Sequence, residues 1–395
     1  MLIARLRQTS VTGYNSSMWS VKKARGSSRE EHYIARIFSR YFPTPELLSP
    51  RSAGVDVSDS SIKWIVIAPR KHGNEVISYG MELMPEGVVE EGAIRDKPAL
   101  TEALKKVKEK MGGVSRAHAA LPEEAAFVFG MHVPEKTPRE QILSMIEFEL
   151  ENRVPLSPRD AVYDFNVIME HDDDIGEEIG VVVFPRELAE SYASVFESAG
   201  IELLSLELEA RSIARAISNG RADEPITLSV DFGRARTGFA VLKRGIPIFT
   251  STVEVGGEAM THALMEKLSL SPEDAQIFKN DQGLLAEGEA KSPGVEALVG
   301  TASALSDEIA RHYHYWDTRR NDKGEHMTPV GCVLIVGGTA NLRGLADYVA
   351  GRIQALTELP NVWQNVCSFN KYIPPIDKRE SLRYATAIGL ALRGI

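Results

Sequence analysis

GVDVSDSSIKWIVI, residues 54–67, is followed 175 residues later by a second version of itself, SVDFGRARTGFAVL, residues 229–242. When Asp56 is aligned with Asp231, three further pairs of apolar residues coincide. These pairs are Trp64 with Phe239, Val66 with Val241 and Ile67 with Leu242. The chain therefore contains an internal repeat, and this repeat restricts the possible folds more than any other feature of the sequence.

Each copy of the repeat predicts a β-hairpin. Runs of β-branched and aromatic residues form two strands around a short polar or glycine-bearing turn, whose free backbone N–H groups can bind an anion. The Asp at the end of each first strand can hold Mg²⁺ through its water ligands. A third, glycine-rich turn follows at residues 336–342, VGGTANL. Two hairpins and a third turn of this kind predict the actin-like nucleotide-binding fold, in which two lobes enclose a cleft.

The composition indicates a globular protein with more than one domain. A chain of 395 residues is longer than the roughly 250–300 residues at which a single core stops growing. The formal charge of −10 argues against a nucleic-acid partner, which requires a basic surface. Two cysteines cannot form a disulfide framework, so we expect a cytoplasmic protein. No run approaches the roughly 18 apolar residues of a membrane span, so membrane association is expected to be indirect.

The first fifty residues differ from the rest. Residues 1–30 are rich in Ser, Arg and Lys without hydrophobic periodicity, and we interpret them as a disordered N-terminal extension. Residues 31–50 predict an amphipathic helix and a linker, with Pro43 ending the helix. This helix either packs on its own domain or docks on a membrane surface or a partner, and the sequence leaves both possibilities open.

Two clusters of polar residues suggest metal sites but are better explained without one. The acidic turn HDDDIGEE, residues 171–178, lacks the ligand spacing of a calcium loop and predicts a solvated hairpin tip. The histidines of HYHYW, residues 312–316, lie two positions apart and therefore on different faces of a helix. We expect packed aromatic side chains there.

An ordered set of motifs extends from the region of Phe42 to the C-terminus. It consists of GVDVSDSSIK, LELEARSIARAI, VDFGRARTGFAV, VEVGGEAMT, SPEDAQIFK, VGGTANLRGL and YATAIGLALRG. In this order and at these spacings, the motifs resemble the PilM family of type IV pilus assembly proteins, which are relatives of the cell-division protein FtsA. The resemblance implies an α/β chain with the duplicated ribonuclease-H-like actin fold, two lobes with a nucleotide cleft, and an extra βα subdomain of the FtsA/PilM type.

The resemblance also implies a division of the chain. The predicted ranges are 51–84, 176–220 and 376–395 for the first lobe, 221–269 and 330–375 for the second lobe, 85–175 for the extra subdomain, and 270–329 for a helical cap over the adenine.

Family positions carried over by motif imply a site for ATP and Mg²⁺. Asp56 and Asp231 would hold the waters of the metal ion, and Glu209 would orient the attacking water. The predicted phosphate contacts are Asp59, Ser60, Ser61 and Lys63 from the first lobe, and Gly233, Arg236 and Thr237 from the second. The predicted adenosine pocket consists of Gly256, Gly257, Gln276, Lys279, Gly337, Gly338 and Thr339. Glu209 could instead be a charge favoured at a helix start, and Lys279 a surface lysine.

Two of the motifs depart from those of the wider superfamily. The first phosphate turn has Ser58 and Asp59 where relatives have a Gly followed by Ser or Thr. A carboxylate about 4 Å from a phosphate costs roughly 4 kcal/mol at an effective dielectric of about 20. Asp59 therefore either weakens ATP binding or points outward. The adenosine motif has Gln276 in place of a Glu, and a neutral amide bonds a ribose hydroxyl less strongly than a carboxylate does.

The function that the resemblance implies is a scaffold at the inner face of the cytoplasmic membrane. It would bind ATP, hydrolyse it slowly at most, and hold the N-terminal tail of a PilN-type inner-membrane protein, with the extra subdomain forming part of the groove. Contacts with pilus motor components and self-association stay open.

Two alternatives compete with this function. An FtsA-like filament former carries an amphipathic membrane helix at its C-terminus, whereas YATAIGLALRGI, residues 384–395, is rich in small residues suited to burial. An actin-fold small-molecule kinase needs a catalytic Asp and a sugar-contacting loop, and the sequence offers no convincing candidate for either.

Overall fold

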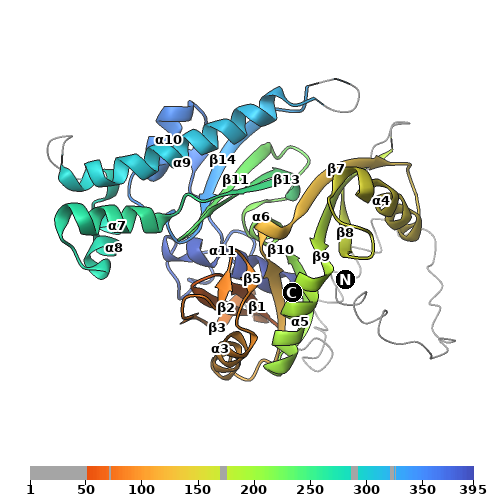
Figure 1. Cartoon of the computed structure of the whole chain (residues 1–395), viewed down its shortest axis with the longest axis horizontal. Helices are drawn as coiled ribbons and strands as arrows, with labels where there is room; N and C mark the ends of the chain where they lie inside the picture. The colour runs from red at the N-terminus through yellow and green to blue at the C-terminus, as the bar shows by residue number, and fades with distance from the viewer. Residues whose placement is uncertain (1–50, 71–72, 170–175, 286–291, 321–323, 325) are drawn as a thin grey trace.

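The computed structural model describes residues 51–395 except 71–72, 170–175, 286–291, 321–323 and 325 (Figure 1). The predicted extension 1–30, the predicted helix and linker 31–50, and most of the acidic turn lie outside the described residues. The described part forms two lobes, each built on a five-stranded sheet, with a third, smaller sheet beside them.

The first lobe is built on a sheet with the strand order β10-β6-β1-β2-β3. Its strands are β1 (Ala53–Val57), β2 (Ser61–Arg70), β3 (Gly73–Leu83), β6 (Arg116–Leu121) and β10 (Glu202–Leu208). The first three strands are antiparallel, while β6 pairs in parallel with β1 and β10 with β6. The helices of this lobe are α3 (Lys97–Lys110), α5 (Arg186–Ser198), α6 (Glu209–Ile217) and α11 (Ala385–Ala391).

The second lobe repeats this topology with the strand order β13-β12-β11-β14-β15. Its strands are β11 (Ile226–Phe232), β12 (Thr237–Lys243), β13 (Ile246–Val253), β14 (Val330–Val336) and β15 (Thr357–Glu358). Again the first three strands are antiparallel and the last two parallel. The helices are α7 (Gly257–Leu268), α8 (Pro272–Asp281), α9 (Pro293–Thr318) and α10 (Leu345–Ile353). The predicted duplicated fold is therefore correct.

The third sheet is antiparallel, with the order β7-β9-β8. Its elements are β7 (Phe127–Val133), β8 (Ala161–Met169), β9 (Glu177–Pro185) and the helix α4 (Arg139–Arg153). The sheet and α4 enclose a small core of their own around Ile146 and Val181. This arrangement divides the predicted range 85–175, because α3 and β6 belong to the first lobe. The separate sheet begins only at β7 and extends beyond residue 175 to the end of β9.

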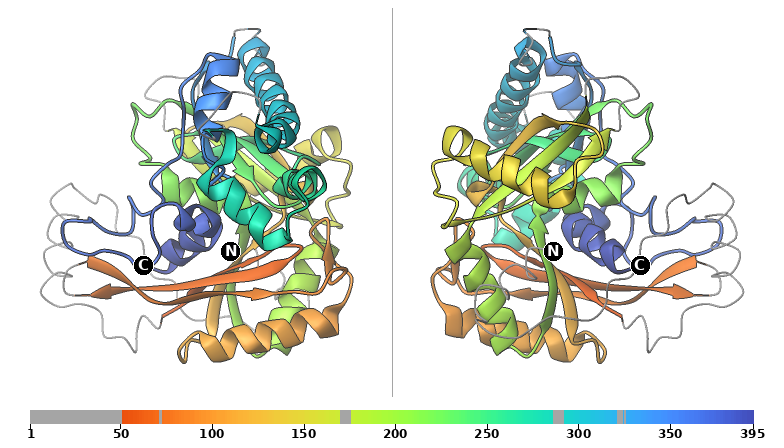
Figure 2. Two further views of the ribbon diagram at one scale, coloured as in Figure 1. Left: turned by 90° about the vertical axis from the view of Figure 1, so that its left-hand side faces the viewer. Right: turned by 90° about the vertical axis from the view of Figure 1, so that its right-hand side faces the viewer.

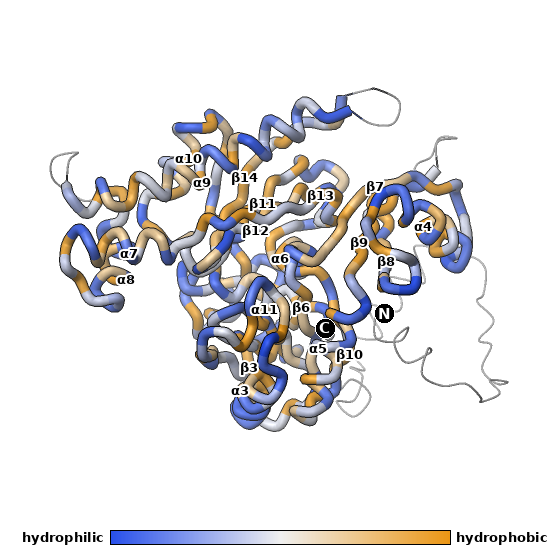
Figure 3. The backbone as a smooth tube through the Cα atoms, viewed as in Figure 1, coloured by the Kyte–Doolittle hydropathy of each residue, from blue (hydrophilic) through white to orange (hydrophobic). Residues whose placement is uncertain are grey.

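Helices α6 and α11 lie between the two large sheets (Figures 1 and 2). All seven residues of α11 are buried, as the small-residue pattern predicts. A side chain on Gly389 would place its Cβ 1.7 Å from the carbonyl oxygen of Ser212 in α6, so only glycine allows this approach. The hydropathy of the chain follows the same plan: apolar stretches follow the central strands, whereas the outer helix α3 is strongly polar (Figure 3).

The HYHYW segment forms the last turns of α9, and two of its rings pack inward. The His312 ring stacks on Phe239 of β12 with 4.1 Å between ring centroids. Trp316 is fully buried and donates to the carbonyl of Thr328 at 2.9 Å. The prediction of packed aromatics is confirmed for these two residues.

Candidate functional site

The two hairpins of the repeat close their turns in the same way. The backbone N–H of Ser58 donates to the carbonyl of Ser61 at 2.9 Å, and Gly233 donates to the carbonyl of Arg236 at 2.9 Å. The strand register also repeats, because Val55 faces Trp64 in the first hairpin as Val230 faces Phe239 in the second. The alignment of Asp56 with Asp231 therefore describes a real structural equivalence.

The two aspartates have different partners across their hairpins. Asp56 faces Lys63, and the Lys63 Nζ lies 3.0 Å from its Oδ2 atom. Asp231 faces Gly238, which offers no charge. Across the two hairpins, Lys63 therefore pairs with Asp56, whereas the position opposite Asp231 carries no positive charge.

The pKa values show this shortage of positive charge. Burial, reinforced by Asp56, raises the pKa of Asp231 to about 6. Glu209, the first residue of α6, has a pKa well above its ordinary value because of burial and the nearby Asp56 charge. Burial alone would lower the pKa of Lys63, but Asp56, followed by Asp231 and Glu209, raises it overall. A bound cation would therefore stabilise the ionised forms of these acids.

Two functional candidates were not predicted from the sequence. Glu123 and Glu124 begin the short 3₁₀ helix η1 (Glu123–Ala125), which follows β6 after Pro122. Glu123 is 7% exposed, and its Oε2 atom has no hydrogen-bond partner among the described residues. Burial and the charge of Asp231 raise the pKa of Glu123 well above its usual range. The only signal in the sequence is an acidic pair placed directly after an apolar strand.

Arg236 connects the two phosphate turns. Its Nη2 atom donates to Asp59 on the first turn, and its Nη1 atom donates to Glu124 at 2.6 Å. The Asp59 carboxylate therefore faces Arg236 of the second lobe. Among the described contacts of Arg236, carboxylates take the places predicted for phosphates.

The third turn packs against the second hairpin. Gly337 has φ +98°, and a Cβ there would lie 2.4 Å from the Asp231 Oδ1 atom, so this position requires glycine. The Thr339 hydroxyl donates to the carbonyl of Gly233 at 2.8 Å. A Cβ on Gly257 would meet that same hydroxyl at 2.2 Å. These glycines bring three chain segments together beside Asp231.

Lys279 is a buried residue and not the surface lysine that the sequence left open. It is 4% exposed, and its Nζ donates to the Thr261 hydroxyl at 2.7 Å and to the carbonyl of Gly257 at 3.2 Å. Burial, with a contribution from Arg234, lowers its pKa to about 8. Gln276, one turn earlier on α8, donates to the Asn280 side chain at 3.3 Å.

Several predicted polar contacts are engaged within their own lobe. The Thr237 hydroxyl donates to the carbonyl of Val255. The Ser61 hydroxyl lies 3.3 Å from that of Ser58, and the Ser60 carbonyl accepts from the backbone of Met84. Gly256 approaches the backbone of Arg234 and Ala235 so closely that a Cβ would clash with both. These groups shape the turns, whereas Asp56, Lys63, Asp231 and Glu209 form one cluster.

The residues of this cluster fit a magnesium nucleotide. Buried or half-buried carboxylates outnumber Lys63, and a divalent cation would supply the missing charge. In the part of the chain that the structure describes, no three His, Cys, Asp or Glu side chains converge as direct metal ligands. Asp56 and Asp231 are the carboxylates at the bases of the two turns that would hold the waters of a Mg²⁺ ion. A Cβ on Gly338 would lie 3.8 Å from the Arg383 Cβ atom, an ordinary contact distance.

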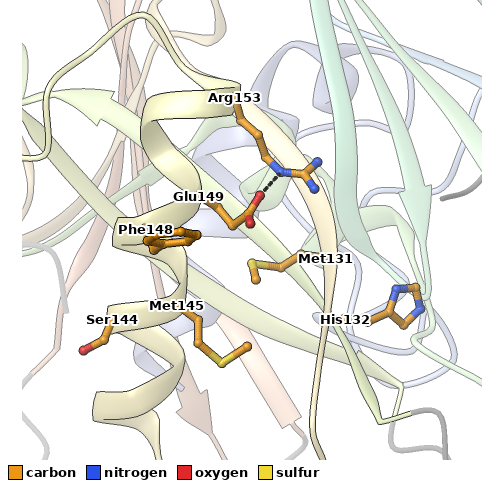
Figure 4. A pocket seen from close by; sticks show the side chains of 7 residues that line it. All are labelled: Met131, His132, Ser144, Met145, Phe148, Glu149 and Arg153. Atoms are coloured by element: carbon orange, nitrogen blue, oxygen red, sulfur yellow. Dashed lines mark hydrogen bonds and ion pairs between the residues drawn. The ribbon is translucent and has the colours of Figure 1, made fainter.

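A groove on the third sheet is the other candidate binding surface. It has a volume of about 510 Å³ and lies between α4 and β7 (Figure 4). Phe148 on α4 is 78% exposed, and Met131 points toward it from β7. Glu149 and Arg153 form an ion pair at 3.0 Å beside these apolar side chains. The groove thus combines an apolar floor with a polar edge.

Comparison with known proteins identifies the family. Residues 54–395 match the family model of type IV pilus assembly protein PilM. The chain belongs to the PilM family. Among solved structures, it is similar to the PilM–PilN type IV pilus biogenesis complex, with 19% identity, a TM-score of 0.71, and coverage of 88% of this chain and 99% of that one.

Two further structures share the fold of this PilM-family chain. The ethanolamine utilization protein EutJ from Carboxydothermus hydrogenoformans is 17% identical, with a TM-score of 0.52 and coverage of 89% and 91% of the two chains. MreB5 of Spiroplasma citri, bound to AMPPNP, is 13% identical, with a TM-score of 0.50 and coverage of 86% and 94%. The fold is thus that of the actin-like ATPases. No helix of the described residues is long and apolar enough to cross a membrane.

Proposed function

We propose that this PilM-family protein is a cytoplasmic scaffold at the inner face of the membrane, which binds ATP with Mg²⁺ and captures the N-terminal tail of a PilN-type protein. The single observation that carries the proposal is the pair of matching turns, with Asp56 and Asp231 at their bases. The MreB5 structure was solved with AMPPNP, which supports a nucleotide in this cleft.

The chain's own residues would divide the work within the site. Asp56 and Asp231 would position the hydrated ion, and Lys63 would neutralise charge beside the first turn. A bound Mg²⁺ ion would supply positive charge that offsets the negative charge of the phosphates. Glu209 and Glu123 are buried acids near Asp231 that could orient a water molecule, and burial raises the pKa of both side chains. Lys279 would fix the cap helix α8 to α7 beside the adenosine.

The third sheet supports the partner half of the proposal. Its groove presents the exposed side chain of Phe148 beside the half-buried side chain of Met145, and nucleotide binding does not require this sheet. A short peptide that becomes ordered on binding loses conformational entropy, so its affinity should be roughly micromolar and depend on a few apolar anchors. The solved PilM–PilN complex supports PilN as the source of the peptide.

The test is a titration of a synthetic PilN N-terminal peptide into the full-length protein in the presence of MgATP. Phe148→Ala should weaken binding by about tenfold or more, since the substitution removes an exposed anchor. Phe369→Ala is the matched control, because Phe369 is an exposed phenylalanine outside the groove. Equal peptide affinity of the two variants would show that the peptide binds outside this groove. No binding of the peptide to the parent would refute the scaffold function.

A further inference from the structure

Arg236 joins the two lobes through two carboxylates. Asp59 lies on the turn between β1 and β2 and Glu124 on η1, whereas Arg236 ends the turn between β11 and β12. Only 16% of the Arg236 side chain is exposed. An ion pair with a guanidinium at this depth is less screened by solvent than a surface pair and holds its geometry more firmly.

Arg234, two residues before Arg236, forms its ion pair within its own lobe. Arg234 belongs to the same turn, but its Nη2 donates at 2.6 Å to Glu258 of α7 in its own lobe. In the first turn of the repeat, the residue equivalent to Arg236 is Ser61, which cannot reach the opposite lobe with a charge. Of the two equivalent turns, the second therefore supplies the arginine that forms the ion pairs between the lobes.

We propose that Arg236 is a latch between the lobes, which the phosphates of a bound nucleotide release by replacing Asp59 and Glu124 as its partners. This inference rests on the nucleotide binding proposed above. A phosphate held between the two turns would lie beside both the guanidinium and Asp59. A guanidinium binds phosphate and carboxylate with the same forked geometry, so the phosphate and Asp59 compete for Arg236. The phosphate also repels the Asp59 carboxylate, because both are negatively charged.

Release of the latch has a route into the first lobe. The second oxygen of Asp59 accepts from the backbone N–H of Gly92 at 3.4 Å, between β4 (Val89–Glu90) and β5 (Ala93–Ile94). The carbonyl of Gly92 accepts from the Tyr192 hydroxyl of α5 at 3.0 Å. When Asp59 loses Arg236, the segment around Gly92 loses a fixed partner. The latch thus couples the occupancy of the cleft to the surface formed by β4, β5 and α5.

The first arm of the test uses the protein without nucleotide. Hydrogen–deuterium exchange of residues 58–61, 89–95 and 233–236 is compared in the parent, Asp59→Asn, Arg236→Gln and the control Arg234→Gln. We expect exchange in 89–95 to become about threefold faster or more in the first two variants and to stay unchanged in the control. Unchanged exchange in all variants would show that Arg236 does not hold the lobes.

The second arm measures MgATP affinity by calorimetry. Asp59→Asn and Glu124→Gln should each tighten binding by about tenfold, because they remove a competitor for Arg236, whereas Arg236→Gln should weaken it by a similar factor. Equal affinities across the three variants, with clear binding by the parent, would refute the exchange of partners while leaving the nucleotide site intact. No binding by the parent would refute the proposed function instead, and the first arm would still decide whether the latch exists.

Discussion

Asp231→Asn should stabilise the empty protein and abolish its response to MgATP. The carboxylate of Asp231 has a pKa of about 6, compared with an ordinary value of 3.8. At about 1.4 kcal/mol for each pKa unit, ionising this group in the folded protein at neutral pH costs at most about 3 kcal/mol. Solvent reaches part of the side chain, and an amide is not identical to a neutral carboxyl. We therefore expect a gain of about 1 to 3 kcal/mol.

The sign of the pH dependence makes this prediction specific. The folded state holds the Asp231 proton more tightly than the unfolded state does. The destabilising charge is therefore absent below about pH 4, grows as the pH rises toward 6, and is fully present above that. The advantage of the Asn variant should follow the same course. For a chain of this length, it corresponds to a rise of roughly 1–4 °C in melting temperature at pH 7.5.

The assay is a set of thermal melts between pH 4.5 and 8, with and without millimolar MgATP. A ligand at 100 times its Kd stabilises the parent by about 2.7 kcal/mol, and the variant should show no such shift. Asp347→Asn is the control, because Asp347 lies exposed on α10, outside the two phosphate turns at residues 58–61 and 233–236. An Asp231→Asn protein that is less stable than the parent when empty, or that keeps the full MgATP shift, would refute the reasoning.

Three further predictions follow from the same geometry. Glu209→Gln should leave MgATP affinity nearly unchanged and lower any hydrolysis by about 10²-fold, as measured by phosphate release; equal rates would remove Glu209 from the mechanism. The MgATP-induced melting shift of the parent should shrink as the pH falls from 7.5 to 5.5, because Asp231 takes up its proton near pH 6 and no longer attracts the ion; a constant shift would separate Asp231 from metal binding. Gly389→Ala should lower the free energy of unfolding by about 3 kcal/mol or more, as measured with denaturant, because its Cβ would overlap Ser212. The control Gly351→Ala, at a helical position with open space, should be neutral or slightly stabilising. Similar costs for the two variants would contradict the close contact of α6 and α11.

The sequence was sufficient for the features that depend on local pattern. The alignment of Asp56 with Asp231 predicted two equivalent hairpins, and the structure pairs the aligned residues in the same way in both. The small residues at the end of the chain predicted the burial of α11. These signals are contained within a few neighbouring residues.

Features that depend on distant pairing were not predictable in the same way. The strand β6 pairs with β1 of the first lobe, although the predicted range 85–175 places it in the extra subdomain. The local pattern of a strand does not specify its partner strand. The partnership of Arg236 with Asp59 joins residues 177 positions apart. Glu123 and Glu124 reach the cleft only because β6 ends there. Such contacts follow from the topology and are not encoded in any motif.

The most direct test of the nucleotide cleft is a crystal structure of the protein with Mg²⁺ and a non-hydrolysable ATP analogue. We expect the phosphates between the turns at residues 58–61 and 233–236, with the ion held through waters by Asp56 and Asp231 and with Arg236 turned from Asp59 toward phosphate. An analogue bound elsewhere, or an empty cleft at saturating concentration with the Arg236–Asp59 contact intact, would contradict the account.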